Sequence, residues 1–412
     1  MSSAILAVNS GSSSIKFALY PQHHAIVDAA VLSGLVDGLE PGGTPAIRLD
    51  SADGREQFPL AAADPEQLFA VALTSLRSLI TQHSTGIDIV AVAHRIVHGG
   101  ERYAASLPVD DEVSSYLQKL APLAPLHQPH NLEGVRAFQQ AYPELPQIAC
   151  FDTGFHSTLP VNESTIPLPL ALRAAGIRRY GFHGLSYRYV AGRLAQHSTR
   201  ASQRVLMAHL GNGASVCAMR DGRSIATTMG FSALDGLMMG TRCGALDPGV
   251  LLHLLQAGWD AKRIETLLYR ESGLLGMSGI SADMRMLRRS ERPEAGAAID
   301  LFAYRIIRES GALSACLQGL DVLAFTGGIG EHDAALREQV ARGLAYLGVK
   351  IDAAKNHAAS GEQIAAIHAP ESSQEVWVIP TDEGRIAAMD AAAWLTAQAA
   401  EKSSKSARHG AG

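Results

Sequence analysis

The chain has few cysteines, aromatic residues and charges for its length: 4 cysteines, 6% aromatic and 18% charged residues in 412. The cysteines lie far apart and form no CxxC pair, so the sequence indicates neither a zinc site nor a disulfide framework. The net charge of −5, with no long basic run, argues against nucleic acid or an anionic membrane as the main partner. No apolar run approaches about 20 residues, and the start MSSAILAVNS lacks a basic leader. These absences favour a reduced cytoplasmic enzyme without a membrane segment.

What the sequence does contain is 47% hydrophobic residues in a chain long enough for two domains. The first informative stretch is 4–20, where apolar runs at 4–8 and 15–20 predict two strands around a polar turn at 9–14. This Gly- and Ser-rich turn leaves backbone N–H groups and hydroxyls for an anion, and Lys16 lies just after it. An ordinary hairpin with a polar tip explains the same residues.

The opening pattern returns in the second half of the chain. The first copy reads VNSGSSSIKF, and the second reads HLGNGASVCA within predicted strands at 203–209 and 216–220. Each half also has a later strand, at 87–92 and 321–325, that leads toward a pair of glycines. Two matches in the same order indicate an internal duplication. Since no GxxxxGK[ST], GxGxxG or HRD signature is present, phosphate binding would have to use the hairpin turns.

Apolar periodicity, capping residues and turn signals predict the remaining elements. They are strands within 24–60, at 147–151 and at 376–379, and helices at 65–84, near 110–119 and 130–141, at 184–197, at 293–317 and from 384 to about 398. Residues 401–412 are rich in Lys, Ser and Gly, and this composition predicts a disordered tail.

Four polar side chains lie at predicted strand ends or beside glycines: Arg95, Asp152, His183 and Arg242. The carboxyl ends of strands in α/β sheets face ligand crevices, so these positions are candidates for a site. Each residue alone has a plainer explanation, as an ion-paired surface side chain or a structural histidine. Together with Gly-rich turns, two arginines, a histidine and carboxylates suit phosphoryl transfer, in which charge must be neutralised in a dry cleft.

Over nearly its whole length the chain resembles the acetokinase family of short-chain carboxylate kinases. The matching segments are NSGSSSIKF (9–17), AHRIVHGG (93–100), LAPLAPLH (120–127), FDTGFH (151–156), RRYGFHGLSYRYV (178–190), HLGNGASV (209–216), DGLMMGTRCGALDPG (235–249), GISADMR (279–285), FTGGIGE (325–331) and PTDEGRIA (380–387). The resemblance implies an α/β fold with two duplicated ribonuclease-H-like domains and an interdomain cleft, as in the superfamily of actin, sugar kinases and heat-shock ATPases. It places an N-terminal domain at 1–152 plus 384–400 and a C-terminal nucleotide-binding domain at 153–383.

The same resemblance implies reversible, direct in-line transfer of the ATP γ-phosphoryl to acetate, giving acetyl phosphate and ADP. It assigns Mg2+, or Mn2+ in its place, to Asn9 and Glu383, and catalysis to Asp152, His183 and Arg242. The residues implied to bind acetate are Arg95, Val97, Leu126, Phe182 and Ala233. Those implied to bind ATP are Lys16, His209, Leu210, Gly211, Asn212, Gly213, Asp283, Met284, Arg285, Gly327, Gly328, Ile329, Gly330 and Glu331. The family also implies a homodimer.

Two of these roles are open to physical argument. Asp152 stands at the family's acid/base position, yet acetate is already ionised at pH 7 and needs charge cancellation rather than a base. We therefore expect Asp152 to position an arginine and the magnesium-bound water.

The acyl pocket departs from the family, because Ser232-Ala233 stands where acetate kinases usually carry Thr-Pro. The smaller alanine predicts a roomier pocket that tolerates propionate.

Other readings of the motifs stay open. Asn9 can simply cap its turn, and Asp283 can simply cap the helix that follows it. A propionate kinase would carry the same motifs. A non-catalytic actin-like nucleotide-binding protein shares the fold, but it needs no arginine pair such as Arg95 and Arg242.

Overall fold

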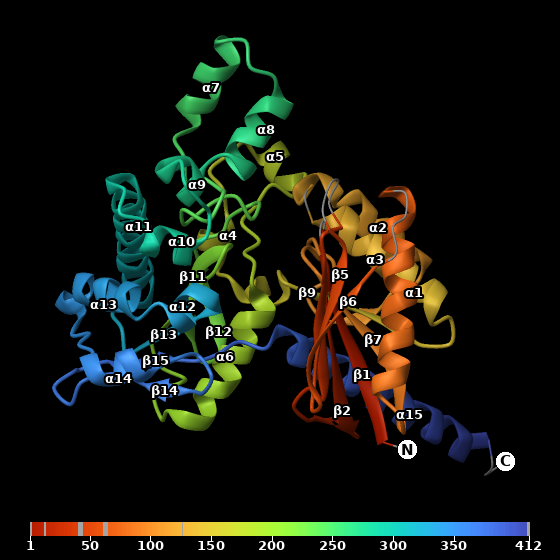
Figure 1. The fold of residues 1–412 in the computed structure, drawn as a ribbon. Helices are drawn as coiled ribbons and strands as arrows, with labels where there is room; N and C mark the ends of the chain where they lie inside the picture. Colours follow the sequence, from red (N-terminus) through yellow and green to blue (C-terminus); the bar gives the residue numbers. More distant parts are fainter. Residues whose placement is uncertain (1, 12–13, 40–43, 61–64, 126, 410–412) are drawn as a thin grey trace. The chain divides into compact units, whose positions relative to one another are not determined.

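The computed structural model describes residues 2–11, 14–39, 44–60, 65–125 and 127–409 (Figure 1). The chain divides into two compact units. Unit 1 comprises Met1–Gly154 and Asp382–Gly412, and unit 2 comprises Phe155–Thr381. The chain passes from unit 1 to unit 2 after residue 154, whereas the sequence predicted this boundary after 152. It returns to unit 1 after residue 381 rather than after the predicted 383.

Unit 1 is built on one mixed sheet. Its strands are β1 (Ser2–Ser10), β2 (Ile15–His23), β3 (Ile26–Val27), β4 (Leu32–Asp37), β5 (Ala46–Ser51), β6 (Gly54–Pro59), β7 (Ile87–Ile96), β8 (Leu107–Pro108) and β9 (Gln147–Phe151). They lie in the order β6-β5-β4-β2-β1-β7-β9-β8, and β3 pairs with β2. β1 pairs antiparallel with β2 and parallel with β7, and β7 pairs parallel with β9.

The sheet of unit 2 repeats this arrangement. Its strands are β10 (Val205–Leu210), β11 (Ala214–Arg220), β12 (Arg223–Thr227), β13 (Val322–Thr326), β14 (Ala365–Ala366) and β15 (Glu375–Val378). They lie in the order β12-β11-β10-β13-β15-β14. Here too an opening hairpin is extended by two parallel strands, so β4-β2-β1-β7-β9 in unit 1 corresponds to β12-β11-β10-β13-β15. This repeated topology matches the duplication that the sequence predicted.

Helices cover both sheets. Those of unit 1 are α1 (Pro65–His83), α2 (Asp111–Lys119), η1 (Ala121–Leu123), α3 (Gln128–Ala141) and α15 (Glu383–His409). The short helix η2 (Gly154–Thr158) spans the boundary, and those of unit 2 are α4 (Val161–Ser164), α5 (Leu170–Ala174), α6 (Gly184–His197), α7 (Pro248–Gln256), α8 (Ala261–Arg270), α9 (Gly273–Ser278), α10 (Met284–Arg289), α11 (Pro293–Leu317), α12 (Gly327–His332), α13 (Ala334–Gly343), η3 (Ala345–Leu347) and α14 (Ala353–Ala358). Local signals set several ends: Asp110 caps α2 by accepting the Val113 N–H, and a left-handed Gln318 closes α11.

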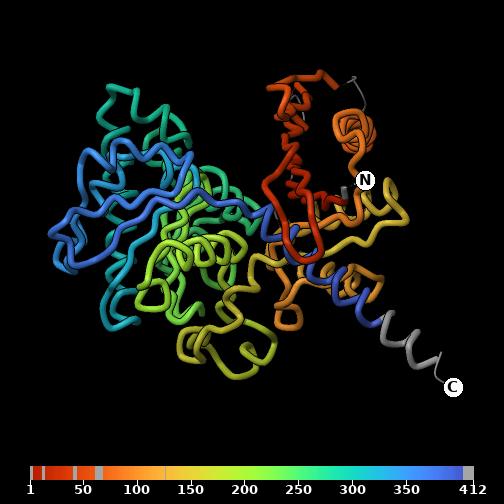
Figure 2. The backbone as a smooth tube through the Cα atoms, turned by 90° about the horizontal axis from the view of Figure 1, so that it is seen from below, coloured from red at the N-terminus to blue at the C-terminus, as the bar shows by residue number. Residues whose placement is uncertain are grey.

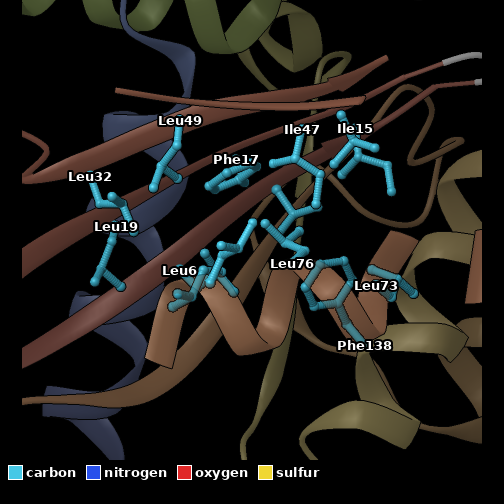
Figure 3. Close-up of a cluster of buried hydrophobic side chains, with 14 of the residues drawn as sticks. Leu6, Ile15, Phe17, Leu19, Leu32, Ile47, Leu49, Leu73, Leu76 and Phe138 are labelled. Atoms are coloured by element: carbon cyan, nitrogen blue, oxygen red, sulfur yellow. The ribbon is translucent and has the colours of Figure 1, made fainter. Parts of the chain in front are cut away.

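The centre of unit 1 is an apolar layer between its sheet and the helices α1 and α3 (Figure 3). The side chains that meet there include Leu6, Ile15, Phe17, Leu19, Leu32, Ile47, Leu49, Leu73, Leu76 and Phe138. β1 is apolar at every position from 4 to 8 because both of its faces are covered, with α15 on the other side.

The C-terminal helix α15 belongs to unit 1, where it packs on the N-terminal strands (Figure 2). Tyr20 donates to Asp382 at 2.6 Å, and Arg385 donates to the Val27 carbonyl at 2.8 Å. The helix continues to His409, past the predicted end near 398 and into the tail that we expected to be disordered. No Gly or Pro interrupts 401–409, so the backbone can stay helical there. Residues 410–412 lie outside the described part of the chain.

In unit 2, α6 and α11 cover opposite faces of the sheet. α6 packs Tyr187, Val190 and Leu194 onto Met207 and Cys217 of the hairpin strands. α11 contacts β10, β11 and β12, and its buried residues recur at helical spacing along most of its length. Among the helices of the described residues, none is long and apolar enough to cross a membrane.

Three buried imidazoles make the stability of the fold depend on pH. Burial lowers the pKa of His94, His98 and His156 from 6.5 to about 4. A hydrogen bond with Gln147 opposes this shift in part for His94, and a hydrogen bond with the Phe182 backbone does so for His156. Between pH 6.5 and 4 the unfolded chain therefore binds protons that the folded chain does not. We expect the free energy of unfolding to be complete above pH 6.5 and to fall on acidification by up to about 1 kcal/mol per pH unit for each imidazole.

Urea unfolding between pH 7 and pH 5 tests this expectation, because carboxylates titrate little in that range. Replacing His156 by asparagine should make the slope shallower, whereas the same change at the exposed His24 should leave it unaltered. A stability that is constant from pH 7 to pH 5 would contradict the prediction.

Candidate functional site

In unit 1 the predicted site residues gather around the guanidinium of Arg95. This residue lies near the carboxyl end of β7, and Asp152 follows the end of the neighbouring parallel strand β9. Arg95 donates from Nε to Oδ1 and Oδ2 of Asp152 at 3.0 and 3.1 Å, and from Nη2 to Oδ2 at 2.5 Å. Glu383, the first residue of α15, places Oε2 3.5 Å from Nε of Arg95. The strand register thus joins two residues that are 57 positions apart in sequence.

Charge keeps this arginine ionised. Burial lowers the pKa of Arg95, but the nearby carboxylates of Asp152 and Glu383 outweigh it, and the net pKa lies above its ordinary value. Asp152 itself is fully buried. Within the described residues the bonds to Asp152 engage Nε and Nη2, and Nη1 takes no part in them. An arginine held along one edge can present its second edge to a carboxylate as a fork.

The opening turn is described only in part, since residues 12 and 13 lie outside the described residues. The Gly11 N–H donates to the Ser14 carbonyl at 2.8 Å, which closes the turn. Asn9 on β1 is paired with Lys16 on β2, and the lysine is exposed. The two residues therefore lie opposite each other across the hairpin, with Asn9 half-buried and Lys16 exposed.

Sequence reasoning missed the residues that hold the loop at 97–100. Asn131 on α3 accepts the Val97 N–H at 3.0 Å and donates to the Ser10 carbonyl at 2.6 Å, so it ties the loop to the end of β1. Gln128 donates to the His98 carbonyl at 3.0 Å. The only signal in the sequence was two polar residues near the start of an otherwise amphipathic helix, which is too weak to predict these contacts.

The oxygen donors of unit 1 suit magnesium. Asn9 offers an amide oxygen and Glu383 a carboxylate that is about one-fifth exposed. Among the described residues, no group of three or more His, Cys, Asp or Glu side chains could hold a metal ion by itself. Magnesium usually takes one or two carboxylates, with substrate phosphates and water as its other ligands, so the two predicted residues fit such an ion.

In unit 2 the predicted ATP residues form two adjoining glycine-containing segments. The hairpin tip at 210–213 is closed by the Gly211 N–H, which donates to the Gly213 carbonyl at 3.0 Å. Gly327 begins α12 with φ +77, and a Cβ there would lie 2.8 Å from the Leu210 carbonyl oxygen. The backbone at the start of α12 therefore lies directly on the hairpin tip, and only glycine allows this approach.

Other predicted ATP residues already have structural partners. Oε1 of Glu331 accepts the N–H groups of Gly327 and Thr381, at 2.8 and 3.0 Å, so this carboxylate holds the start of α12. Asp283 caps α10 and pairs with Arg285 at 2.6 Å on the surface. Met284 is buried, as a core residue would be. The plainer reading of Asp283 as a helix cap therefore describes one of its contacts.

The catalytic candidates of unit 2 gather beside the same tip. The imidazole of His183 stacks on that of His209, with ring centroids 4.2 Å apart. Its Nδ1 lies 2.8 Å from the Ser215 hydroxyl. Arg242 donates from Nη1 to the Ala233 carbonyl at 2.6 Å. A Cβ on Gly213 would lie 2.8 Å from Nη2 of Arg242 and 3.2 Å from Nε2 of His183, so the glycine lets both side chains approach the tip.

His156 contacts the backbone next to His183. It was not predicted as a site residue from the sequence, although it belongs to the quoted segment FDTGFH. Its Nε2 lies 2.8 Å from the Phe182 carbonyl and its Nδ1 2.8 Å from the Ser224 hydroxyl. A carbonyl only accepts, so Nε2 donates and Nδ1 accepts. The neutral imidazole therefore fixes the backbone next to His183. Gly181, with φ +76, passes too close to the imidazole to carry a side chain.

The residues predicted to form the acyl pocket are found in each unit separately. Val97 is buried in unit 1, Phe182 is buried in unit 2, and Ala233 is half-buried in unit 2. Leu126 lies outside the described residues. The pocket formed by these side chains stays a prediction.

A duplicated α/β fold, with a glycine-containing hairpin tip in unit 2, one arginine near a strand end in unit 1 and another in a loop beside the tip, suits a two-domain phosphotransferase. Comparison with known proteins agrees. A model of the acetokinase family matches residues 4–389. An acetate kinase from Rhodopseudomonas palustris is 49% identical over 390 residues, which cover 93% of this chain and 96% of that protein.

Solved structures show the same fold. A propionate kinase from Francisella tularensis matches with a TM-score of 0.86 at 35% identity, and the acetate kinase from Porphyromonas gingivalis with 0.83 at 36%. Each match covers 94% of this chain and 98% of the other. The chain belongs to the acetokinase family. The predicted family, the duplicated fold and the assignment as a kinase are confirmed.

Proposed function

We propose that this protein is an acetate kinase that transfers the γ-phosphoryl of ATP to acetate reversibly and in line, giving acetyl phosphate and ADP, and that it also accepts propionate. The observation that carries the proposal is the Arg95 guanidinium, which Asp152 holds along one edge at the end of β7. Such an arginine binds a carboxylate side-on. An actin-like nucleotide-binding protein would have no use for it.

In unit 1, Arg95 would bind the acetate carboxylate and cancel its charge, which otherwise repels the γ-phosphate. Asp152 and Glu383 would orient Arg95, and Asp152 would act as a positioning group rather than a base, because acetate is ionised at pH 7. Asn9 and Glu383 would hold Mg2+, or Mn2+ in its place, with Lys16 beside the nucleotide. When bound, the metal supplies charge neutralisation on the phosphates.

In unit 2, the hairpin tip and the start of α12 would hold the ATP phosphates through backbone N–H groups. Arg242 and His183 would stabilise charge on the transferring phosphoryl. Glu331 would act mainly through the loop that it holds, since its Oε1 accepts two backbone N–H groups. The remaining residues assigned to ATP are His209, Leu210, Gly211, Asn212, Gly213, Asp283, Met284, Arg285, Gly327, Gly328, Ile329 and Gly330.

Trapping of the acyl phosphate with hydroxylamine tests the function directly. With ATP, Mg2+ and acetate, we expect acetohydroxamate to accumulate in proportion to ADP. Turnover on propionate alone would make the protein a propionate kinase, and ATP binding without hydroxamate would contradict the proposal. The four cysteines are thiols and ATP is the co-substrate, which together support a cytoplasmic location.

The acyl specificity should depend on Ala233. Replacing it by proline fills the pocket but keeps the carbonyl that accepts from Arg242. One methylene is worth about 1–3 kcal/mol of discrimination, so the ratio of kcat/KM for propionate to that for acetate should fall about tenfold or more. Parallel kinetics on the two acids measure the ratio within one preparation, and an unchanged ratio would refute the idea.

We further propose a homodimer in which α7 is part of the interface. This helix has the sequence PGVLLHLLQ, yet none of its residues is buried within the chain, and Leu252 is 61% exposed. An apolar helix whose contacts with α8 leave Leu252 and Leu255 exposed fits a subunit contact. Replacing Leu252 and Leu255 together by glutamate should give a monomer by light scattering. The control is Ile26→Glu, at a comparably exposed position of unit 1; a dimer in the double variant would exclude this interface.

A further inference from the structure

The imidazole of His183 is connected to a buried tyrosine through a buried serine. His183 precedes α6 with a left-handed backbone, φ 59 and ψ 24, and Tyr187 lies one helical turn further along. The Ser215 hydroxyl on β11 is 2.8 Å from Nδ1 of His183 and 2.5 Å from the Tyr187 hydroxyl. Ser215 and Tyr187 are fully buried, and His183 is 8% exposed. Water therefore does not compete for the two hydrogen bonds at the serine.

Elementary hydrogen-bond chemistry favours one direction along this chain. The serine hydroxyl has a single proton, so it donates to one neighbour and accepts from the other. Burial raises the pKa of Tyr187 well above its ordinary value, and hydrogen bonds with Ser215 and with the His209 backbone offset this only in part. The phenol thus keeps its proton, and a phenol is a stronger donor than an alkyl hydroxyl. Donation from Tyr187 to Ser215 leaves the serine proton for Nδ1 of His183.

The other ring nitrogen is the one that lies beside the hairpin tip. Nε2 of His183 and Nη2 of Arg242 lie within 3.2 and 2.8 Å of the point where a Cβ on Gly213 would stand. When Nδ1 accepts a proton from Ser215, a neutral imidazole carries its own proton on Nε2. His183 then presents an N–H donor on the same side as the guanidinium. The opposite tautomer would present a lone pair there, which repels an anion.

We propose that Tyr187 and Ser215 are positioning residues that act through His183: their hydrogen bonds fix the tautomer with the proton on Nε2, so that the imidazole donates to a phosphoryl oxygen. The proposal rests on the role in phosphoryl transfer given to His183 above. A neutral donor of this kind is set before substrate binds. It therefore needs no proton uptake during the reaction.

The ring nitrogens of His183 can be observed directly in protein labelled with 15N-histidine, by long-range 1H–15N correlation spectra at neutral pH. The signal of His183 is identified by its disappearance in His183→Gln. We expect the wild-type spectrum to show protonated Nε2 and unprotonated Nδ1. In Ser215→Ala and Tyr187→Phe the pattern should shift toward the other tautomer or a mixture. In the same variants kcat should fall about 10- to 100-fold, with the KM values for ATP and acetate changed less than about twofold.

Tyr189→Phe removes a hydroxyl from the same helix at a half-buried position and should leave the spectrum and kcat unchanged. Circular dichroism and the melting temperature show whether each variant is folded. A wild-type His183 with its proton on Nδ1, or variants that lose activity while His183 keeps the Nε2-protonated form, would overturn the proposal. The spectrum decides this even if no acetohydroxamate forms, so a failure of the proposed function remains distinguishable.

Discussion

Replacing Asp152 by asparagine lowers kcat/KM for acetate by about 10²- to 10³-fold, and neither higher pH nor added small bases restores the activity. The size follows from the pair that is broken: removing one partner of a buried, hydrogen-bonded charge pair costs about 2–5 kcal/mol in ligand binding. Asparagine could still accept from Nε with its amide oxygen, but the bond from Nη2 and the negative charge would be lost, and among the described residues Glu383, at 3.5 Å from Nε, would be the carboxylate that remains beside Arg95. The absence of rescue follows because acetate arrives ionised and needs no base.

The measurement is the pH–rate profile of the variant with and without small bases. Partial recovery at high pH, or in the presence of imidazole or formate, would show that Asp152 abstracts a proton and would contradict the positioning role. Asp110→Asn is a matched control in the same unit. Asp110 caps α2, and asparagine caps a helix equally well, so that variant should behave like the wild type.

Replacing Gly213 by alanine lowers kcat by about 10²-fold with little change in stability. The added methyl would stand 2.8 Å from Nη2 of Arg242 and 3.2 Å from Nε2 of His183. The end of the flexible arginine can move away at small cost to folding, but a displacement of about 1 Å at the reacting groups is enough for a loss of this size. Because the tip backbone stays in place, the KM for ATP should change less than kcat.

Steady-state kinetics and thermal unfolding of one preparation separate the two effects. Gly192→Ala serves as the control, since a Cβ at this exposed position of α6 meets nothing within 4 Å and favours the helix. It should melt slightly higher and turn over normally. A Gly213→Ala enzyme with wild-type kcat would show that the two side chains do not have to approach the tip.

Local patterns were enough for much of the fold. The helix at 293–317 was predicted at the residues where α11 lies, because Pro293 begins it and its apolar residues recur at helical spacing. The two hairpins around 9–14 and 210–215 were also visible, since their Gly- and Ser-rich turns interrupt apolar runs. At the C-terminus the predicted helix end near 398 was wrong, because α15 continues to His409.

Contacts between distant positions were beyond the sequence. Nothing in the residues themselves shows that Gln128 and Asn131 hold the loop at 97–100, that His156 supports Phe182, or that Oε1 of Glu331 receives the Thr381 N–H. Such partners depend on which strands and helices pack together. That packing is decided by the burial of the whole apolar surface rather than by local preference.

By itself, then, the sequence determined the kinds of residue at the site, their places at strand ends and turns, and the family to which they belong. The tertiary structure decided which of them share a hydrogen bond. Parallel pairing of β7 and β9 brings Asp152 to Arg95, and pairing of β10 with β11, covered by α6, brings Ser215 to both Tyr187 and His183. The physical reason is that side-chain chemistry is carried by each residue alone, whereas its direction and its partners are set by the packing of elements far apart in the chain.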